Sequence, residues 1–315
     1  MAKFDRLHVI VLAGDEDTGL DSLTRVLTGS AVPKQFAFIA GASLLQQTVA
    51  GYARLVPADN IVAVVSARHE RLARRQLQRW PGVGVLPRTL NRGPALDTLL
   101  ALGRLEAHHP DAAVIVAPSH NFLLEPRLLT SALAAATLVP HAAPAILAGA
   151  ACSSMASLAG EEVGLILPGG RLDGQLWAVR RIVDRPTPAL ARKLRTAGAL
   201  WNTGTFGGRV SDLWRLARQT LPGEAATIGG LWSGRTAGLE VIDAALGHLP
   251  AKPTAALWRE PKELALLPVR DAGWSAWRSP EEVVDSMSDS EQLEILLARI
   301  FHRQKAAVIR AAPVL

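Results

Sequence analysis

Cysteine and long apolar runs are both scarce in this sequence. The single cysteine, Cys152, excludes any disulfide within the chain and is typical of a reducing compartment. No stretch approaches the ~20 apolar residues that a membrane-spanning helix needs. The apolar run at residues 7–13 is too short for a signal peptide, and acidic residues follow it closely. We therefore expect a cytoplasmic protein with no membrane partner.

Phenylalanine and tyrosine are also few, with six and one in 315 residues. The formal net charge is +6, and the basic residues are mostly arginines scattered along the chain. Binding to nucleic acid usually relies on clustered cations, and binding to single strands also relies on aromatic stacking platforms. Nucleic acid is therefore not the expected partner.

Apolar residues are abundant, at 49% of the chain, which is enough for a substantial core. Near-continuous apolar runs predict strands that are buried on both faces. They lie at residues 7–13, 60–65, 112–117 and 143–150. Apolar residues at helical spacing lie at 41–55, 69–80, 94–106 and 128–139. This alternation predicts an α/β fold with a mostly parallel central sheet and helices on both faces.

The second half of the chain has a different pattern. Residues 163–170 and 175–186 predict a hairpin with a glycine-rich turn, so we expect a small antiparallel subregion around residues 160–210. Two helical patterns follow, whereas residues 253–278 are rich in tryptophan and irregular. The end of the chain predicts helices, because Ser279 is followed by a proline and two glutamates, a good helix start.

The first predicted strand leads into a turn and then a helix, as VIVLAGDEDTGLDSLTRVLTGSAVPKQF over residues 9–36. Strand, turn and helix are the usual arrangement for binding phosphate, because main-chain N–H groups and the helix dipole point at the anion. No G-x-x-x-x-G-K-[ST] or G-x-G-x-x-G motif occurs, so neither a Walker-type NTPase nor a dinucleotide-binding protein is supported.

The chain nevertheless resembles a known family. Leu12 to Arg25 reads L-A-G-D-E-D-T-G-L-D-S-L-T-R, and Pro33-Lys34-Gln35-Phe36 follows. This resembles the start of the sugar-1-phosphate nucleotidyltransferases, in particular the mannose-1-phosphate guanylyltransferases (GDP-mannose pyrophosphorylases), with L-A-G-G-x-G-T-R-L-x-P-L-T-R and P-K-Q-F. Further segments resemble family motifs in the same order: Asn91-Arg92-Gly93, residues 114–121, residues 162–166, residues 183–186, residues 200–204 and Gly273-Trp274-Ser275.

The resemblance covers roughly residues 8–283. It implies a Rossmann-like nucleotidyltransferase domain, which we expect over residues 1–283, with a C-terminal helical segment over 284–315. The implied reaction joins GTP and mannose-1-phosphate to give GDP-mannose and pyrophosphate, with Mg²⁺ as the cofactor. The ligand would be a nucleotide or a sugar phosphate, and a homodimer is compatible with this architecture.

The resemblance also implies roles for individual residues. Lys34 and Arg25 correspond to catalytic positions. The positions that correspond to nucleotide contacts are Leu12, Ala13, Gly14, Thr18, Lys34, Asn91 and Gly93. Those that correspond to sugar contacts are Gly164, Asp184, Arg185 and Asn202.

The chain departs from the family pattern where the phosphate charge is handled. Asp15 and Asp17 stand where the family has glycines, and Gly19 stands where it has an arginine. The family holds Mg²⁺ with two aspartates, whose positions are His120 and Ala276 here. Neither residue is a good ligand for a hard cation, so we predict no metal site of the family's type.

These departures favour a guanylyltransferase-like protein whose catalysis is weakened or lost, a pseudoenzyme that retains nucleotide or sugar-phosphate binding or acts as a regulator or scaffold. A second hypothesis is an active nucleotidyltransferase that holds Mg²⁺ with relocated acids: Asp15, Asp17, Asp243 or Asp271. The guanidinium of Arg278, at a family glycine position, offers another source of positive charge. A third hypothesis is a binding protein for RNA or another polyanion.

Overall fold

The computed structural model of this chain describes residues 4–14, 18–39, 41–139, 143–151, 163–232, 237–258, 261–288 and 290–311. Its strands are β1 (Leu7–Ala13), β2 (Ile61–Ser66), β3 (Gly84–Arg88), β4 (Ala113–Pro118), β5 (Phe122–Leu123), β6 (Ala145–Ala150), β7 (Leu165–Arg171), β8 (Trp177–Val183), β9 (Leu200–Arg209), β10 (Leu264–Val269) and β11 (Trp274–Ser275). Its helices are α1 (Asp21–Thr28), α2 (Leu44–Tyr52), α3 (Glu70–Gln76), α4 (Gly93–His108), α5 (Pro126–Leu138), α6 (Pro188–Thr196), α7 (Val210–Thr220), α8 (Pro222–Leu231), α9 (Leu239–Gly247), α10 (Pro280–Ser286) and α11 (Glu291–Ala311). Asp15, Asp17 and Cys152 lie outside the described residues.

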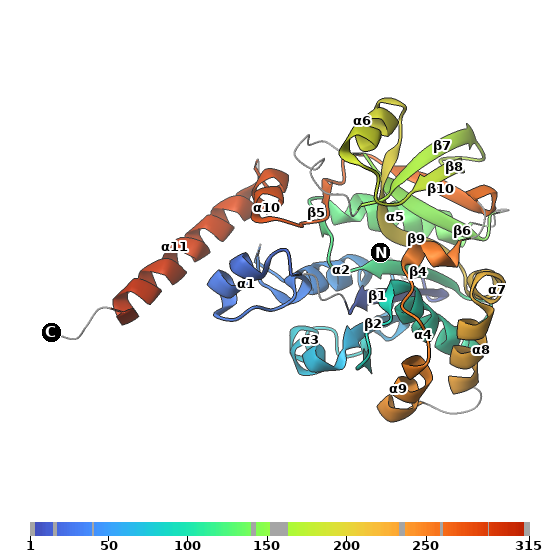
Figure 1. Cartoon of the computed structure of the whole chain (residues 1–315), viewed down its shortest axis with the longest axis horizontal. Helices are drawn as coiled ribbons and strands as arrows, with labels where there is room; N and C mark the ends of the chain where they lie inside the picture. Colours follow the sequence, from blue (N-terminus) through green and yellow to red (C-terminus); the bar gives the residue numbers. More distant parts are fainter. Residues whose placement is uncertain are drawn as a thin grey trace.

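A nine-stranded sheet runs through the described chain in the order β3-β2-β1-β4-β9-β6-β10-β8-β7 (Figure 1). β1 pairs in parallel with β2 and β4, β2 with β3, and β6 with β10. β9 runs antiparallel between β4 and β6. The strands β1, β2, β3, β4, β6 and β10 therefore all end at one edge of the sheet, which we call the carboxyl edge.

Part of this sheet closes on itself. β8 pairs antiparallel with β10 and with β7, and β7 pairs with the start of β9. The strands β9, β6, β10, β8 and β7 thus form a small ring, the five-strand barrel.

The central sheet is therefore mixed, and the prediction of a mostly parallel sheet is wrong in this respect. The expected antiparallel subregion is present in β7, β8 and β9. The parallel strands predicted from apolar runs are confirmed as β1, β2, β4 and β6.

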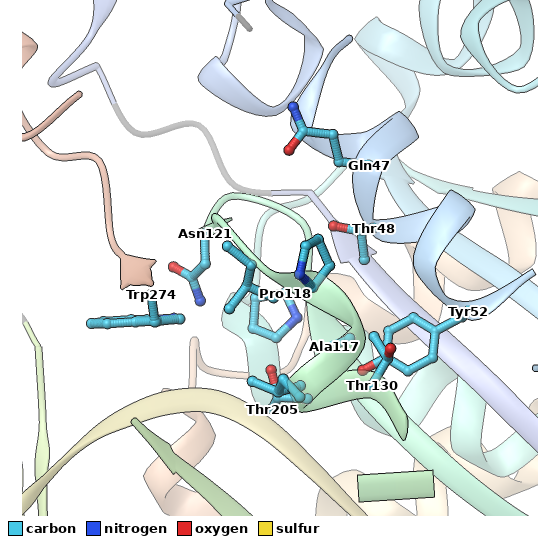
Figure 2. Close-up of a pocket in the computed structure, with 12 residues that line it drawn as sticks. Gln47, Thr48, Tyr52, Ala117, Pro118, Asn121, Thr130, Thr205 and Trp274 are labelled. Atoms are coloured by element: carbon cyan, nitrogen blue, oxygen red, sulfur yellow. The ribbon is translucent and has the colours of Figure 1, made fainter. Parts of the chain in front are cut away.

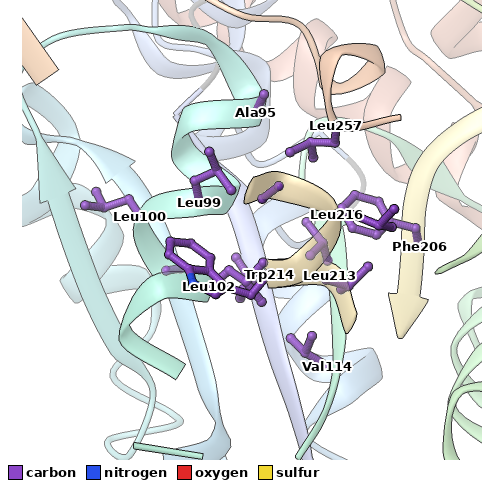
Figure 3. Packing of buried hydrophobic residues seen from close by; sticks show 14 of the residues in the cluster. Ala95, Leu99, Leu100, Leu102, Val114, Phe206, Leu213, Trp214, Leu216 and Leu257 are labelled. Carbon is purple, nitrogen blue, oxygen red and sulfur yellow. The ribbon is translucent and has the colours of Figure 1, made fainter. Parts of the chain in front are cut away.

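Helices cover both faces of the sheet because its strands are apolar on both faces. In β1, Val9 and Val11 pack in one core cluster with α2, α3 and α5, while Ile10 and Leu12 pack in another with α4, α7, α8 and α9. Figure 3 shows the second cluster, where α4 meets Trp214 of α7. Neighbouring side chains of a strand point to opposite faces of the sheet, so a buried strand contributes residues to the core on each face.

The C-terminal helices pack beside α1. Leu20 and Leu27 share a third core cluster with Val283, Met287 and Leu296. Beyond that contact α11 extends away from the body of the molecule (Figure 1). The division into residues 1–283 and 284–315 stays a prediction. In the part of the chain that the structure describes, no helix combines the length and the apolar character needed to cross a membrane.

Candidate functional site

The predicted phosphate turn begins on a fixed platform at the carboxyl edge. Three buried polar side chains hold the main-chain carbonyls of residues 12–14. Ser119 Oγ donates to the first carbonyl at 3.0 Å, Gln35 Nε2 to the second at 3.2 Å and Arg88 Nη2 to the third at 2.7 Å. Leu12, Ala13 and Gly14, predicted as nucleotide contacts, are therefore held in place on their carbonyl side.

Arg88 belongs to a buried ion pair that sequence reasoning missed. Its Nε lies 2.9 Å from Asp97 Oδ1, and its Nη2 lies 3.1 Å from Asp97 Oδ2. A Cβ at Gly14 would lie 2.4 Å from Arg88 Nη2, so the close approach of this guanidinium requires glycine there. An arginine at the end of β3 and an aspartate in α4 give no motif, and only the fold brings them together.

Lys34 is directed into the protein. It lies in a 3₁₀ turn over Lys34–Phe36 and is 3% exposed. Its Nζ donates to the carbonyl of Ala276 at 2.7 Å and to that of Trp277 at 3.0 Å. The ammonium group therefore ties the P-K-Q-F segment to the chain after β11.

The structure brings the two metal positions of the family together. β5 and β11 pair antiparallel, with Phe122 opposite Ser275, so His120 and Ala276 lie at the same end of this short ladder. The ring of Phe122 stacks on that of Trp277 at 4.4 Å. A histidine and an alanine do not fit Mg²⁺, because imidazole is a poor ligand for a hard cation and a methyl group offers no ligand atom. Within the described residues no group of three or more His, Cys, Asp or Glu side chains could hold a metal ion.

The other charged groups considered for this role lie on separate elements. Asp243 in α9 accepts a hydrogen bond from the main-chain N–H of Thr89 at 3.0 Å. Asp271 follows β10, beside a different cavity. Arg278 pairs with Glu282 through its guanidinium and its main-chain N–H. The guanidinium of Arg278 is therefore already matched by a carboxylate.

The Asn91-Arg92-Gly93 segment lies at the carboxyl edge after β3, where its polar groups hold the local backbone. Asn91 Oδ1 accepts from the N–H of Gly93 at 3.1 Å. Gly93 has φ 82° and packs so closely that a Cβ would lie 2.4 Å from the carbonyl oxygen of Lys252.

Two further predicted residues, Thr18 before α1 and Arg25 within it, have exposed side chains.

Three of the four predicted sugar contacts meet in space. The N–H of Asn202 donates to the carbonyl of Gly164 at 2.9 Å. Asp184 Oδ1 lies 3.0 Å from the position that a Cβ of Gly164 would take. Arg185, next to Asp184, is exposed and has φ 46°. The order of motifs in the sequence thus corresponds to a cluster at the start of β7, the end of β8 and the start of β9.

A small cavity lies between α2, α5 and the carboxyl edge, with Asn121 and Trp274 at one side and Tyr52 and Thr130 at the other (Figure 2). Its volume is about 30 Å³, enough to hold ordered water. The hydroxyl of Tyr52 and Nε1 of Trp274 are buried without a hydrogen-bond partner among the described residues, and burial raises the pKa of Tyr52. This cavity suits ordered water and is too small for a nucleotide.

Several solved structures have a fold similar to that of this chain. A mannose-1-phosphate geranyltransferase from Thermus thermophilus is 22% identical and superposes over 90% of this chain and 80% of its own, with a TM-score of 0.76. A mannose-6-phosphate isomerase from Helicobacter pylori is 17% identical over 85% of this chain and 99% of its own, with a TM-score of 0.67. An inositol-1-phosphate CTP transferase from T. maritima is 17% identical over 94% and 96%, with a TM-score of 0.54.

No protein-family model and no curated protein sequence matches the chain. The similarity is therefore one of three-dimensional structure. Sequence identities below 25% to these solved structures show a shared fold and nothing more. The pairing of β5 with β11 and the cluster of Gly164, Asp184 and Asn202 agree with the order of motifs seen in the sequence. The chain has the α/β fold of these solved structures, which is the fold that the sequence resemblance implied.

Proposed function

We propose that this chain is a mannose-1-phosphate guanylyltransferase-like protein that binds a nucleotide or a sugar phosphate and whose metal-dependent catalysis is weakened or lost. The transfer reaction would build negative charge on a phosphate, and nucleotidyltransferases need cations to stabilise it. The proposal depends on how the cations at the carboxyl edge are used in this chain.

One observation carries the proposal: Lys34, the cation retained in the P-K-Q-F motif, donates to the carbonyl of Ala276, which stands at a metal-ligand position. Ala276 therefore offers no carboxylate to Mg²⁺. Its carbonyl also accepts a hydrogen bond from Lys34, the lysine that would otherwise meet phosphate. His120 and Ala276 supply no carboxylate, and Arg278 is paired with Glu282. The described cations Lys34, Arg88 and Arg278 thus already have partners within the protein, whereas Arg25 in α1 is exposed.

A pyrophosphorolysis assay tests the loss of catalysis. The protein is incubated with GDP-mannose, pyrophosphate and Mg²⁺, and GTP formation is measured. We expect no turnover above the rate without protein. Turnover at an ordinary enzymatic rate, on the order of 1–10³ s⁻¹, would contradict the proposal and favour relocated acidic ligands.

Thermal denaturation with GTP or GDP-mannose, each with and without Mg²⁺, tests the retained binding. A ligand that binds the folded chain raises the unfolding temperature, and at a concentration of 100 Kd it adds about 2.7 kcal/mol. We expect a shift that does not need Mg²⁺. The absence of any shift would leave only the scaffold role.

The double variant His120→Asp/Ala276→Asp restores the family's two carboxylates. If the pocket otherwise keeps its shape, the GTP-induced shift should become dependent on Mg²⁺. The matched control Asn121→Asp/Ala272→Asp adds the same charge at neighbouring positions and should not create this dependence. Equal behaviour of both variants would show that the pocket differs by more than its two missing carboxylates.

A further inference from the structure

A second, larger cavity opens at the mouth of the five-strand barrel. Its volume is about 830 Å³. Every strand of the ring contributes a wall residue, or ends directly before one: Ala151 after β6, Pro168 in β7, Trp177 in β8, Leu200 in β9 and Pro268 in β10. Small-molecule sites commonly lie in the mouths of barrels and have volumes of about 300–1,000 Å³.

The rim of this cavity is positively charged. Arg192 and Arg195 reach it from α6, and Arg270 reaches it from the turn after β10. Among the described residues that line it, Asp271 is the one acidic residue beside these three cations. No salt bridge within the described residues engages any of the three arginines, whereas Arg74, Arg88, Arg215 and Arg278 are paired.

The wall and the rim differ in chemistry. The wall includes Trp177, Pro168 and Pro268, and the rim offers guanidinium groups, which can bind phosphate oxygens in a bidentate manner. A cavity whose charged residues are mostly of one sign also concentrates the electric field of that charge. A ligand that satisfies both parts carries a phosphate and a compact uncharged body that packs on an aromatic face.

We propose that the barrel mouth is a binding site for a small phosphorylated molecule, separate from the predicted nucleotide and sugar contacts. Its phosphate lies among Arg192, Arg195 and Arg270, and its uncharged part lies against Trp177. Among the described residues, none of those predicted for the phosphate turn, nor Lys34, nor the cluster of Gly164, Asp184 and Asn202 lines this cavity. The site is thus additional to the one on which the proposed function rests.

Isothermal titration calorimetry on the full chain tests the site with three probes: glucose 6-phosphate, inorganic phosphate and glucose. We expect glucose 6-phosphate to bind more tightly than inorganic phosphate, and glucose not to bind. The variant Arg192→Ala/Arg195→Ala should raise the Kd for glucose 6-phosphate by at least about tenfold, which is about 1.4 kcal/mol. Trp177→Ala should weaken the binding of glucose 6-phosphate and leave the affinity for inorganic phosphate unchanged.

The matched control is Arg71→Ala/Arg75→Ala. It removes the same charge from exposed positions one helical turn apart on α3 and should bind glucose 6-phosphate like the wild type. Absence of binding to the wild type, equal losses in both double variants, or equal binding of glucose would each overturn the proposal. If neither GTP nor GDP-mannose binds the wild type, while glucose 6-phosphate binds and depends on Arg192 and Arg195, ligand binding at the predicted nucleotide and sugar contacts is refuted and this site stands.

Discussion

The buried ion pair below the phosphate turn gives the most direct test of how this edge is held together. Arg88 is fully buried and Asp97 is 5% exposed, and two contacts of 2.9 Å and 3.1 Å join them. In the variant Asp97→Asn one carboxylate oxygen becomes an NH₂ group. That group faces a guanidinium N–H, donor against donor, and the charge of Arg88 loses its counterion in a dry site.

Removing one partner of a buried ion pair typically destabilises a protein by about 3–5 kcal/mol, because the remaining charge is left without compensation. Folded domains of ordinary stability have only about 5–15 kcal/mol in total, so Asp97→Asn should be close to the limit of folding. The double variant Arg88→Met/Asp97→Leu removes both charges and keeps much of the volume. We expect it to lose much less stability than the single variant, since apolar replacement of a whole buried pair is often neutral.

The assay is urea denaturation of both variants, with Arg215→Ala as the control. Arg215 pairs with Asp212 at 3.0 Å on the surface, with side chains 49% and 37% exposed. An exposed pair of this kind contributes about 0–1 kcal/mol. A loss for Asp97→Asn as small as that for Arg215→Ala would refute the reasoning, and so would a double variant less stable than the single one. The double variant should also weaken GTP binding, because the carbonyl of Gly14 loses its donor.

Two further predictions concern a buried lysine and a partly buried histidine. Lys34→Met leaves two main-chain carbonyls without their donor and should lower the free energy of unfolding by at least about 1.5 kcal/mol, whereas Lys193→Met on the exposed side of α6 should change it little; equal losses by urea denaturation would contradict this. Burial and the neighbouring His109, whose ring stacks on His8 at 4.8 Å, lower the pKa of His8 from 6.5 to about 4. The unfolded chain therefore takes up this proton first, so the contribution of His8 to stability is present above pH 6.5 and is lost as the pH falls from 6.5 towards 4. His8→Leu should make the free energy of unfolding depend less on pH between about pH 7 and pH 5. An unchanged pH dependence would show that His8 does not contribute.

Strongly periodic segments could be predicted from sequence, and segments whose pattern depends on the barrel could not. The run at 7–13 is apolar on both faces, and β1 has the predicted bounds. β10 was missed, because its LALLPV contains Pro268 and follows an irregular stretch, although the strand lies in the middle of the sheet. β10 pairs with β6 and β8 within the sheet, and its side chains enter the core clusters on both faces. This tertiary packing outweighs the local preference of a proline.

The candidate site was predictable as an ordered set of motifs, but its internal contacts were not. Gly164, Asp184 and Asn202, which the resemblance implies as sugar contacts, lie together in the structure, and their role in binding stays a prediction. The direction of the Lys34 side chain and the pairing of Arg88 with Asp97 depend on which elements the fold places opposite them. A sequence shows that a lysine or an arginine is present, and it does not show whether a carbonyl or a carboxylate already uses its charge.

The use of cations in this chain follows a pattern with a chemical consequence. At the carboxyl edge, Lys34 and Arg88 have fixed partners within the protein, and each is buried. Such charges cannot turn to a ligand without leaving their own partners unpaired, at a cost comparable to that of breaking a buried pair. The exposed arginines at the barrel mouth, such as Arg192 and Arg270, carry no such penalty. The two regions therefore differ in how their cations are used: Lys34 and Arg88 bind groups of the protein itself, whereas those two arginines at the barrel mouth are exposed. We therefore expect added salt to weaken binding at the barrel mouth more than binding of GTP.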